Sequence, residues 1–330
     1  MSDRTTPLRL ARRIGLAATA ATLLSASAGL AADTFIRIGS GLAGTYPIVG
    51  AKMAELINAN IEGVEATTVS GGTSANFVRL QDGEIEMLLT YSFLSGIVRD
   101  DGGSLGVQVP KVRHLMTLYG AFFQPIAAEG TGITSLSQAA DGPNRVWGAN
   151  RTSIFFPMIE AALQAHDVEL DDITAAGGVV ESIGYGDTAQ AMQDGRLDIG
   201  FFAGPAPYSL MLQVEDNPGF ELLGFSEEAA AEFAELLPGT RAEIIPAGTY
   251  EGQDEDKLIP YVVNQLVISS EVSDELAYQI TKVLVENHEE FHGLFAGAQE
   301  IVPAIALDNN PVEVHPGAAR YYEEAGITAR

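Results

Sequence analysis

A glycine pattern close to the N-terminus matches a spacing that proteins use to bind phosphate groups. Gly39, Gly41 and Gly44 follow a predicted strand at 35–38 as GxGxxG and open a predicted helix. Dinucleotide-binding proteins use such glycines to bring the backbone close to a pyrophosphate, and they add an acidic residue at the end of the next strand. Here the next strand ends at Ser70 without a carboxylate. The glycines therefore favour an anion site made by free N–H groups at the helix start, and a tight turn without a ligand is the alternative.

A second pattern, formed by His288, Glu289 and His292, has the HExxH spacing of zinc enzymes. On an α-helix this spacing puts two imidazoles on one face, where they can bind zinc. A catalytic site needs a third ligand, and the sequence offers only Glu313 or the Glu323-Glu324 pair, without a further signature. Regularly spaced apolar residues explain the same predicted helix by packing alone. We therefore expect ordinary half-buried histidines here, with an exported zinc hydrolase as the less favoured alternative.

Small polar residues recur at one kind of place, where a predicted strand ends and a loop or helix begins. In open α/β sheets, ligands bind at the carboxyl ends of the strands. Hydroxyl groups, amides and helix N-termini suit a small anionic or zwitterionic solute, and aromatic rings can form the walls of its site. Each residue alone could simply cap a helix, but their repetition favours a binding site. The candidate ligand-binding residues are Ser40, Gly41, Thr45, Tyr46, Gly72, Thr73, Ser74, Asn76, Tyr91, Ser92, Tyr119, Asn150, Arg151, Thr152, Ser153, Phe202 and Gly204.

These candidates depend on an alternation of strands and helices along the chain. Such alternation is typical of an α/β fold with parallel strands. Two irregular stretches, 100–106 and 246–260, are predicted to be loops. The predicted strands are 35–38, 64–69, 86–90, 112–119, 146–148, 198–202 and 261–268, and the predicted helices include 153–166, 188–193, 273–291 and 316–325.

The composition excludes several functional classes. The 330 residues include 44 acidic and 18 basic side chains and no cysteine, and the formal net charge is −26. Without cysteine there are no disulfides, thiolate zinc sites or cysteine nucleophiles. The negative charge argues against nucleic acid and against anionic membrane surfaces, because both attract clustered Lys and Arg. The length is that of about two domains.

The N-terminal segment has the features of a secretory signal peptide. Arginines up to Arg13 form a basic start, residues 14–24 are apolar, and a run of small residues precedes Asp33. The apolar run is shorter than the roughly 20 residues that span a bilayer. We expect cleavage near Ala31 or Ala32, export to the periplasm and no insertion of the mature chain into the membrane. The residues around the arginines favour the general export route over the twin-arginine route.

Five segments, taken in order, resemble one family of binding proteins. The first segment, 38–51, holds the glycine pattern and continues with Thr-Tyr-Pro-Ile-Val-Gly-Ala. The others are 70–76, 191–198 with the Phe-Phe-Ala-Gly-Pro that follows it, 245–250 and 315–326. Together they are similar to the TAXI family, the solute-binding subunits of one class of tripartite ATP-independent periplasmic (TRAP) transporters. The similarity extends over nearly the whole mature chain.

The resemblance implies an α/β fold of the type II periplasmic-binding-protein class, with two lobes and a hinge. After a signal peptide at 1–32, lobe 1 would comprise 33–122 with 250–330, and lobe 2 would comprise 123–249. Such proteins trap a solute between the lobes and pass it to TRAP membrane subunits that an ion gradient drives. Glutamate and related carboxylates are ligands in the family. The resemblance therefore implies an acidic amino acid or a C4–C5 dicarboxylate such as 2-oxoglutarate, with no cofactor and no catalysis.

Arg151 is the one basic side chain among the candidate residues. With Asn150, it stands where the TAXI family more often has small residues. Its guanidinium could hold a ligand carboxylate through two parallel hydrogen bonds, or it could be a solvated surface charge. A binding protein of an ATP-driven (ABC) importer would share the fold, and only the five segments separate the two transport classes.

Overall fold

The computed structural model describes residues 34–330 apart from 42, 43, 101, 103–105, 107 and 152. The predicted signal peptide at 1–32 and the candidate residue Thr152 lie outside the described residues. The strands are β1 (Thr34–Ser40), β2 (Val64–Ser70), β3 (Met87–Tyr91), β4 (Val112–Ala128), β5 (Arg145–Trp147), β6 (Val179–Glu181), β7 (Ile199–Gly204), β8 (Phe220–Leu222), β9 (Arg241–Ile245) and β10 (Lys257–Ser269). The α-helices are α1 (Tyr46–Asn60), α2 (Thr73–Gln81), α3 (Ser92–Asp100), α4 (Phe156–Gln164), α5 (Leu170–Ala175), α6 (Thr188–Gln193), α7 (Ser209–Asp216), α8 (Glu227–Leu236), α9 (Asp274–Glu286) and α10 (Pro316–Ala325).

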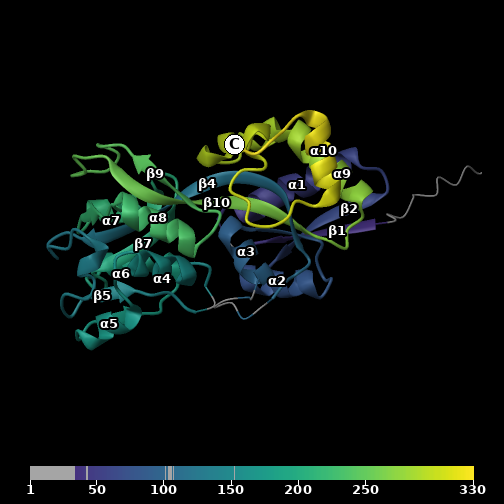
Figure 1. Cartoon of the computed structure of the whole chain (residues 1–330). Coiled ribbons are helices and arrows are strands. Elements are labelled where there is room, and N and C mark those ends of the chain that lie inside the picture. The colour runs from purple at the N-terminus through teal and green to yellow at the C-terminus, as the bar shows by residue number, and fades with distance from the viewer. Residues whose placement is uncertain (1–33, 42–43, 101, 103–105, 107, 152) are drawn as a thin grey trace, which may run out of the picture. The chain divides into compact units, whose positions relative to one another are not determined.

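The described strands form one mixed sheet (Figure 1). Its main order is β2-β1-β3-β10-β4-β7-β5-β6, with β8 paired to β4 and β9 paired to β10. β3 is buried at every position and β10 at all but its first two, which is typical of strands with both faces covered. The α/β class predicted from the alternating pattern is confirmed.

The prediction of parallel strands holds on each side of the sheet and is wrong at its centre. β1 pairs in parallel with β2 and β3, and β5 pairs in parallel with β6 and β7. By contrast, β10 runs antiparallel to both β3 and β4, and β4 runs antiparallel to β7. The sequence did not reveal this because a strand that is buried on both faces has the same apolar pattern in either direction.

The two central strands connect the sides of the sheet. β4 has 17 residues and β10 has 13, so both are longer than predicted, and Lys257–Pro260 are strand rather than loop. β4 pairs with β10 over most of its length and with β7 from Phe122 onward. The carboxyl end of β3 reaches β10 where Tyr91 pairs with Asn264. The carboxyl end of β7 reaches β4 where Gly204 pairs with Phe122. The ends of these two strands therefore approach the middle of the β4–β10 pair.

Helices cover both faces of the β1–β3 side (Figure 1). Leu88 of β3 packs in one apolar cluster with residues of α2 and α3, such as Phe77 and Phe93. Its neighbours Met87 and Leu89 pack in a second cluster with residues of α1, α9 and α10. This alternation follows from the two-residue period of a strand, which turns successive side chains to opposite faces.

A β-bulge interrupts the pairing of β4 with β10 beside Asn264. Val263 pairs with Gly120 and Gln265 with Thr117, so the single residue Asn264 stands opposite two residues of β4, Leu118 and Tyr119. Its side chain is buried and its amide donates a hydrogen bond to the Tyr119 carbonyl at 3.0 Å. Bulges of this kind bend a strand and redirect one side chain, often next to a functional site.

A glycine of β4 makes room for a tyrosine ring of the neighbouring strand β10. A Cβ atom added to Gly120 would lie 1.7 Å from Cε1 of Tyr261, so only glycine fits under this ring. The Glu300 carboxylate accepts hydrogen bonds from the Gly120 N–H at 3.0 Å and from the Tyr261 hydroxyl at 2.6 Å. Glu300 thus binds both strands of this antiparallel pair.

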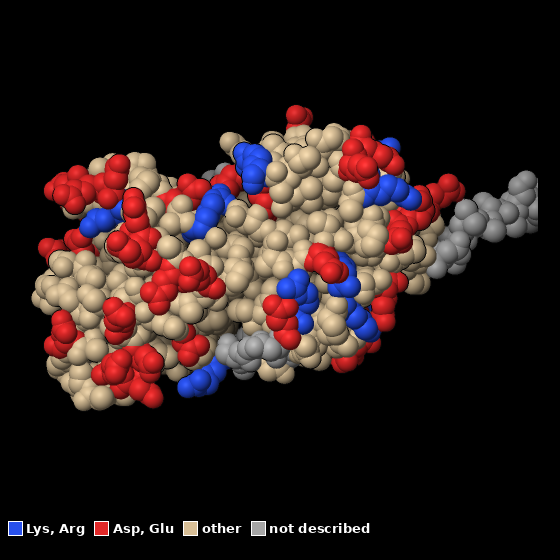
Figure 2. Space-filling view, in the orientation of Figure 1, with Lys and Arg blue, Asp and Glu red and all other residues tan. Residues whose placement is uncertain are grey.

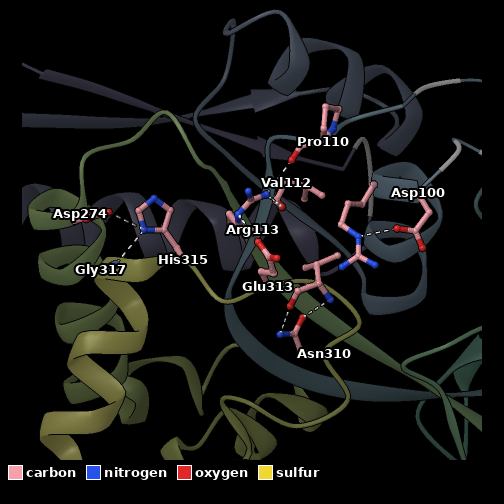
Figure 3. A network of polar contacts seen from close by, with 11 residues as sticks. Asp100, Pro110, Val112, Arg113, Asp274, Asn310, Glu313, His315 and Gly317 are labelled. Carbon is pink, nitrogen blue, oxygen red and sulfur yellow. Dashed lines mark hydrogen bonds and ion pairs between the residues drawn. The ribbon is translucent and has the colours of Figure 1, made fainter.

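The C-terminal segment packs against β4. The final helix α10 has the predicted bounds, and the Tyr322 hydroxyl at its end donates to the Leu115 carbonyl of β4 at 2.7 Å. Ahead of this helix, the Glu313 carboxylate lies 3.4 Å from the Arg113 guanidinium of β4, and His315 caps the helix start (Figure 3). The predicted helix 273–291 is shorter than expected, because α9 ends at Glu286 and a 3₁₀-helix follows.

Acidic side chains spread over the surface of the structure. Figure 2 shows them scattered over the side that carries α5 to α8, at the left of the view, with few basic side chains among them. Among the residues that the structure describes, no helix is long and apolar enough to cross a bilayer.

Candidate functional site

The ends of β1 and β2 are held together by one buried amide. Because β1, β2 and β3 are parallel, their carboxyl ends lie on the same edge of the sheet. Gly71 N–H donates to the Ser40 carbonyl at 3.1 Å, and the buried Asn76 side chain donates to the carbonyls of Ser40 and Gly71, both at 3.2 Å. The structure thus brings the predicted residues Ser40 and Asn76 together. Asn76 orients the two loops rather than offering a free amide.

The glycine loop has a packing role that the sequence could not show. A Cβ atom on Gly39 would lie 2.7 Å from Ile85 Cδ1 and 3.1 Å from Asn76, so β1 and α2 approach closely only over a glycine. Gly44 has φ +77° and is otherwise in open space. Two neighbouring residues, 42 and 43, lie outside the described part of the loop.

Four helices that begin next to candidate residues lack side-chain caps. The helices α1, α2, α4 and α7 begin after Thr45, Gly72, Phe155 and Tyr208, and none of these residues makes a side-chain capping hydrogen bond. The helix α6 also lacks such a cap, whereas α8, α9 and α10 are capped by Ser226, Ser273 and His315. Uncapped N–H groups at a helix start attract an anion. The predicted residues Gly41, Thr73 and Ser74 belong to the same segments.

Tyrosine hydroxyls gather where the β3 end meets the central strands. The Thr45 hydroxyl is 2.5 Å from the Tyr119 hydroxyl, and the Tyr46 hydroxyl donates to the Asn264 side-chain carbonyl at 2.8 Å. The rings of Tyr46 and Tyr91 meet edge to face with centroids 6.4 Å apart. The structure therefore brings together four predicted residues, Thr45, Tyr46, Tyr91 and Tyr119.

Burial keeps these phenols neutral. It raises the pKa of Tyr46, Tyr91 and Tyr119 well above the ordinary value near 10, and Tyr91 further raises the pKa of Tyr46 and of Tyr119, while the hydrogen bond with Thr45 lowers that of Tyr119. At neutral pH each of them carries its proton and can donate a hydrogen bond.

Ser92 has a structural partner. This side chain is fully buried, and its hydroxyl donates to the Gly239 carbonyl at 2.8 Å. The contact joins the end of β3 to the loop before β9. The backbone thus uses the Ser92 hydroxyl as a donor.

The candidates on the other side of the sheet are less uniform. Asn150 and Arg151 are exposed, and the Arg151 guanidinium lies 5.1 Å from the centre of the Phe156 ring. The Ser153 hydroxyl accepts from the Phe155 N–H at 3.2 Å, as an N-terminal turn residue does. Phe202 is fully buried and packs behind the site.

Gly204 at the end of β7 makes room for a ring that the sequence reading missed. A Cβ atom on Gly204 would lie 2.5 Å from Tyr208 Cδ2. The hydroxyls of Tyr208 and Tyr185 are 3.2 Å apart, and the Tyr185 ring is 6.3 Å from that of Phe202. Tyr185 follows the end of β6 and Tyr208 follows the end of β7. The rule that identified the other candidates, a polar residue just after a strand, would have identified these two tyrosines as well.

The HExxH pattern does not form the helix face that zinc enzymes use. His288 lies in the 3₁₀-helix after α9, its Nδ1 is 2.9 Å from the Val285 carbonyl, and His292 Nε2 is 3.1 Å from the Ile301 carbonyl. One ring nitrogen of each histidine is therefore used by the backbone. Within the described residues, no three His, Asp or Glu side chains gather as metal ligands would.

A cavity of about 250 Å³ lies away from the candidate residues. Its lining includes Glu221, Glu251 and Lys257. A second and smaller cavity reaches Tyr119 from the side of Tyr261 and Glu300.

Comparisons with solved structures agree with this architecture. PhnD1 from Prochlorococcus marinus, solved in complex with methylphosphonate, is 8% identical with a TM-score of 0.53, and the match covers 89% of this chain and 99% of that one. The periplasmic binding protein BugD is 10% identical with a TM-score of 0.51, covering 90% of this chain and 99% of that one. At such identities the likeness shows the fold, which is the mixed α/β fold of two-lobed periplasmic binding proteins.

The sequence itself matches a family over most of its length. The match extends over residues 38–326, from the middle of β1 to the end of α10, and so includes every element that bears a candidate residue. The chain belongs to the NMT1-like family.

Proposed function

We propose that this protein is a periplasmic solute-binding subunit of a transport system and that it captures a small carboxylate. The solute binds where the ends of β3 and β7 approach the β4–β10 pair. It is an acidic amino acid such as glutamate or a C4–C5 dicarboxylate such as 2-oxoglutarate. The protein performs no catalysis and needs no cofactor.

One observation carries the proposal. The helices α1, α2 and α7, which begin next to candidate residues, leave their first N–H groups without side-chain caps. An anion at the strand ends would satisfy these groups. Each helix start contributes roughly 0.3–2 kcal/mol to anion binding, and each hydrogen bond to a charged group about 1.5–3 kcal/mol. A micromolar Kd corresponds to a binding free energy of about −8 kcal/mol, and a few such contacts supply it.

The proposed lobes are 33–122 with 250–330, and 123–249. Support comes from β4 and β10, which are the strands that pair with elements of both groups. β4 runs from one group into the other after Phe122, β10 pairs with β9 of the second group, and strands shared in this way make a natural hinge. The NMT1-like family and the fold shared with BugD support the binding role, and the methylphosphonate of PhnD1 is itself a small anion.

The proposed membrane partners are the subunits of a TRAP transporter, because of the five TAXI-like segments. A binding protein of an ABC importer is the second candidate, since the fold serves both. Uptake of the solute by cells tells them apart: collapse of the ion gradient stops TRAP-driven uptake, while loss of ATP alone stops import by an ABC transporter.

A thermal-shift screen tests the binding role. The purified protein is unfolded and refolded to remove any ligand acquired in the cell, and is then melted with carboxylates, amino acids or sugars. A ligand at 100 times its Kd stabilises the folded state by about 2.7 kcal/mol, so we expect a rise in Tm of a few degrees with carboxylates. A rise with sugars alone would contradict the proposed solute class.

A further inference from the structure

Two arginines of this acidic protein differ from its other basic side chains. The structure describes 14 of the 18 lysines and arginines, and 12 of these 14 form an ion pair with an Asp or Glu side chain. Among the described residues, no carboxylate forms such a pair with Arg79 or Arg151. A guanidinium is always charged, so the charge of these two side chains is left without a paired carboxylate.

Arg79 is held at the carboxyl end of β2. It belongs to the last turn of α2, and one nitrogen of its guanidinium, Nη1, donates to the Ser70 carbonyl and to the Asn76 side-chain carbonyl, both at 3.0 Å. Asn76 in turn donates to the carbonyls of Ser40 and Gly71. The guanidinium is therefore anchored to the ends of both β1 and β2.

A glycine makes room for this arrangement. Gly71 is the first residue after β2, and a Cβ atom there would lie 2.5 Å from Nη1 of Arg79 and 2.4 Å from Oδ1 of Asn76. A larger residue would push the guanidinium away from the strand end. The next residue, Gly72, precedes α2, whose first N–H groups have no side-chain cap. A cationic side chain and a helix start are thus neighbours here, and both attract an anion.

The Arg79 guanidinium has one edge that the described residues leave free. Arginine carries five N–H donors, and the two contacts of Arg79 use only those of Nη1. Within the described part of the chain, Nε and Nη2 have no hydrogen-bond partner, and the residue is partly exposed. Their parallel N–H groups match the two oxygens of a carboxylate. Because Nη1 is anchored, a ligand has less side-chain freedom to remove when it binds this edge.

The end of β2 is close enough to the proposed binding region for one solute to reach both. Only β1 lies between β2 and β3, and neighbouring strands are about 4.8 Å apart, so the ends of β2 and β3 are roughly 10 Å apart. In an extended C5 dicarboxylate, four C–C bonds of about 1.5 Å put the carboxyl carbons roughly 5 Å apart. A solute held at the β3 end by one carboxylate can therefore bring the other toward Arg79.

We propose that Arg79 is a specificity-determining residue whose Nε–Nη2 edge binds one carboxylate of a dicarboxylate solute. This inference rests on the proposed function and deepens it, because it selects solutes with two carboxylates over solutes with one. A neutral amide or a methyl group in the place of that carboxylate cannot accept the two charged hydrogen bonds, so such solutes bind more weakly.

Calorimetric titration with matched pairs of probes tests this assignment on the unfolded and refolded protein. L-glutamate is compared with L-glutamine, and 2-oxoglutarate with 2-oxopentanoate, so the members of each pair differ by one carboxylate. Arg79→Gln should weaken binding of the preferred dicarboxylate by about tenfold or more and change its monocarboxylate partner by less than twofold. Arg79→Lys keeps the charge without the paired N–H edge, so its loss should lie between those of the unaltered protein and Arg79→Gln.

Arg113→Gln is the matched control. It removes the same charge and a guanidinium that also donates to two carbonyls, those of Pro110 and Val112. Arg113 pairs with Ile268 of β10, which also pairs with Met87 at the start of β3, so this arginine lies at the opposite edge of the sheet from the end of β3. Arg113→Gln should bind every probe like the unaltered protein.

The results separate the two proposals. If the unaltered protein binds no carboxylate, the proposed function is wrong and the role of Arg79 falls with it. If the protein binds both members of a pair equally, or if Arg79→Gln stays within twofold or weakens both members alike, the assignment of Arg79 is wrong and the binding role stands. If the monocarboxylates do not bind measurably, added salt decides: dicarboxylate affinity should fall less steeply in Arg79→Gln than in Arg113→Gln, and equal slopes would overturn the assignment. All titrations are made well below the Tm of each variant, so a loss of binding reflects the site and not unfolding.

Discussion

The Tyr46 hydroxyl donates a hydrogen bond of 2.8 Å to the side-chain carbonyl of Asn264, across 218 residues of sequence. Asn264 of β10 lies opposite the bulge of β4, and its amide also donates to the Tyr119 carbonyl. The first turn of α1 is thereby tied to the point where the central strands change register. A change at the candidate site can reach β10 through this single side chain.

Asn264→Ala should therefore lower both stability and ligand affinity. It removes two buried hydrogen bonds and leaves the Tyr46 hydroxyl and the Tyr119 carbonyl without partners, at about 1–3 kcal/mol each. Urea unfolding measures the loss. Asn58→Ala is the control, because Asn58 also makes two hydrogen bonds, to the Ala66 backbone, but is exposed. An equal loss in both variants would contradict the importance of the bulge.

Gly120→Ala should lower the stability of the protein where β4 pairs with β10. The new methyl group would overlap the Tyr261 ring, and moving the ring breaks the hydrogen bond from Tyr261 to Glu300. Overpacking of this kind lowers the free energy of unfolding by about 1–3 kcal/mol. Chemical unfolding compared with Gly293→Ala, at an exposed glycine with open space around it, gives the measurement. Similar stability of the two variants would show that the strands can separate without penalty.

His315 should make α10 sensitive to acid. Its Nδ1 accepts from the Gly317 N–H at 3.2 Å, so the imidazole caps the helix only while this nitrogen is unprotonated (Figure 3). Burial lowers the pKa of His315 and Arg113 lowers it further, while the Val272 carbonyl and Asp274 raise it. The folded pKa lies below the unfolded value near 6.5. Stability from this group is therefore complete above about pH 6.5 and is lost as the pH falls through the folded pKa.

The variant His315→Asn keeps a side-chain cap and removes the titration. Between pH 7 and pH 5, the unaltered protein should lose roughly 1 kcal/mol more stability than this variant. Guanidinium unfolding at several pH values measures the difference. Parallel stability curves for the two proteins would show that the imidazole does not titrate there.

Most phenols should resist ionisation until the protein unfolds. The pKa is raised for nine of the ten tyrosines, by burial at most of them and by a hydrogen bond to Glu324 at Tyr278. Unfolded phenols ionise near pH 10, so the unfolded state binds fewer protons above that pH and stability falls. Absorbance at 295 nm should stay low at pH 10.5 and rise on unfolding. A titration that matches the denatured protein throughout would refute this.

Arg151→Ala should weaken a dicarboxylate more than a monocarboxylate if the guanidinium turns from the Phe156 ring toward the ligand. The loss expected from a charged hydrogen bond is about tenfold or more. Calorimetry with 2-oxoglutarate and a matched monocarboxylate measures it, and Arg196→Ala, at another exposed arginine beyond α6, is the control. Equal losses for both ligands would place Arg151 outside the site.

The sequence predicted the type of most elements, because their apolar periods are strong. The strand β2 and the helices α6 and α10 have nearly the predicted bounds. The long strands β4 and β10 were predicted too short. Gly120 in β4 and Pro260 in β10 look like breaks in a sequence, but the structure uses the glycine for close approach and keeps the proline within β10. The direction of a strand could not be predicted either, because a strand buried on both faces has the same apolar pattern in either direction.

The sequence predicted where the candidate residues gather, but it identified only some of the residues that lie there. Hydroxyls after strand ends pointed to Thr45, Tyr46 and Tyr91, which the structure brings together. Asn264 could not be found in this way, because it lies inside a strand and depends on a bulge. Whether a polar residue faces a ligand or serves the backbone is set by tertiary contacts, as the Ser92 contact with Gly239 shows.

The place of β10 has a consequence for how the chain is made. β10 is the last strand to be synthesised, yet it lies between β3 and β4 in the sheet. A ribosome must deliver the segment up to Ser269 before these two strands can be joined, and the growing chain carries two open strand edges until then. A nascent polypeptide of this topology stays unfinished, and so able to be threaded through a narrow channel, for most of its translation.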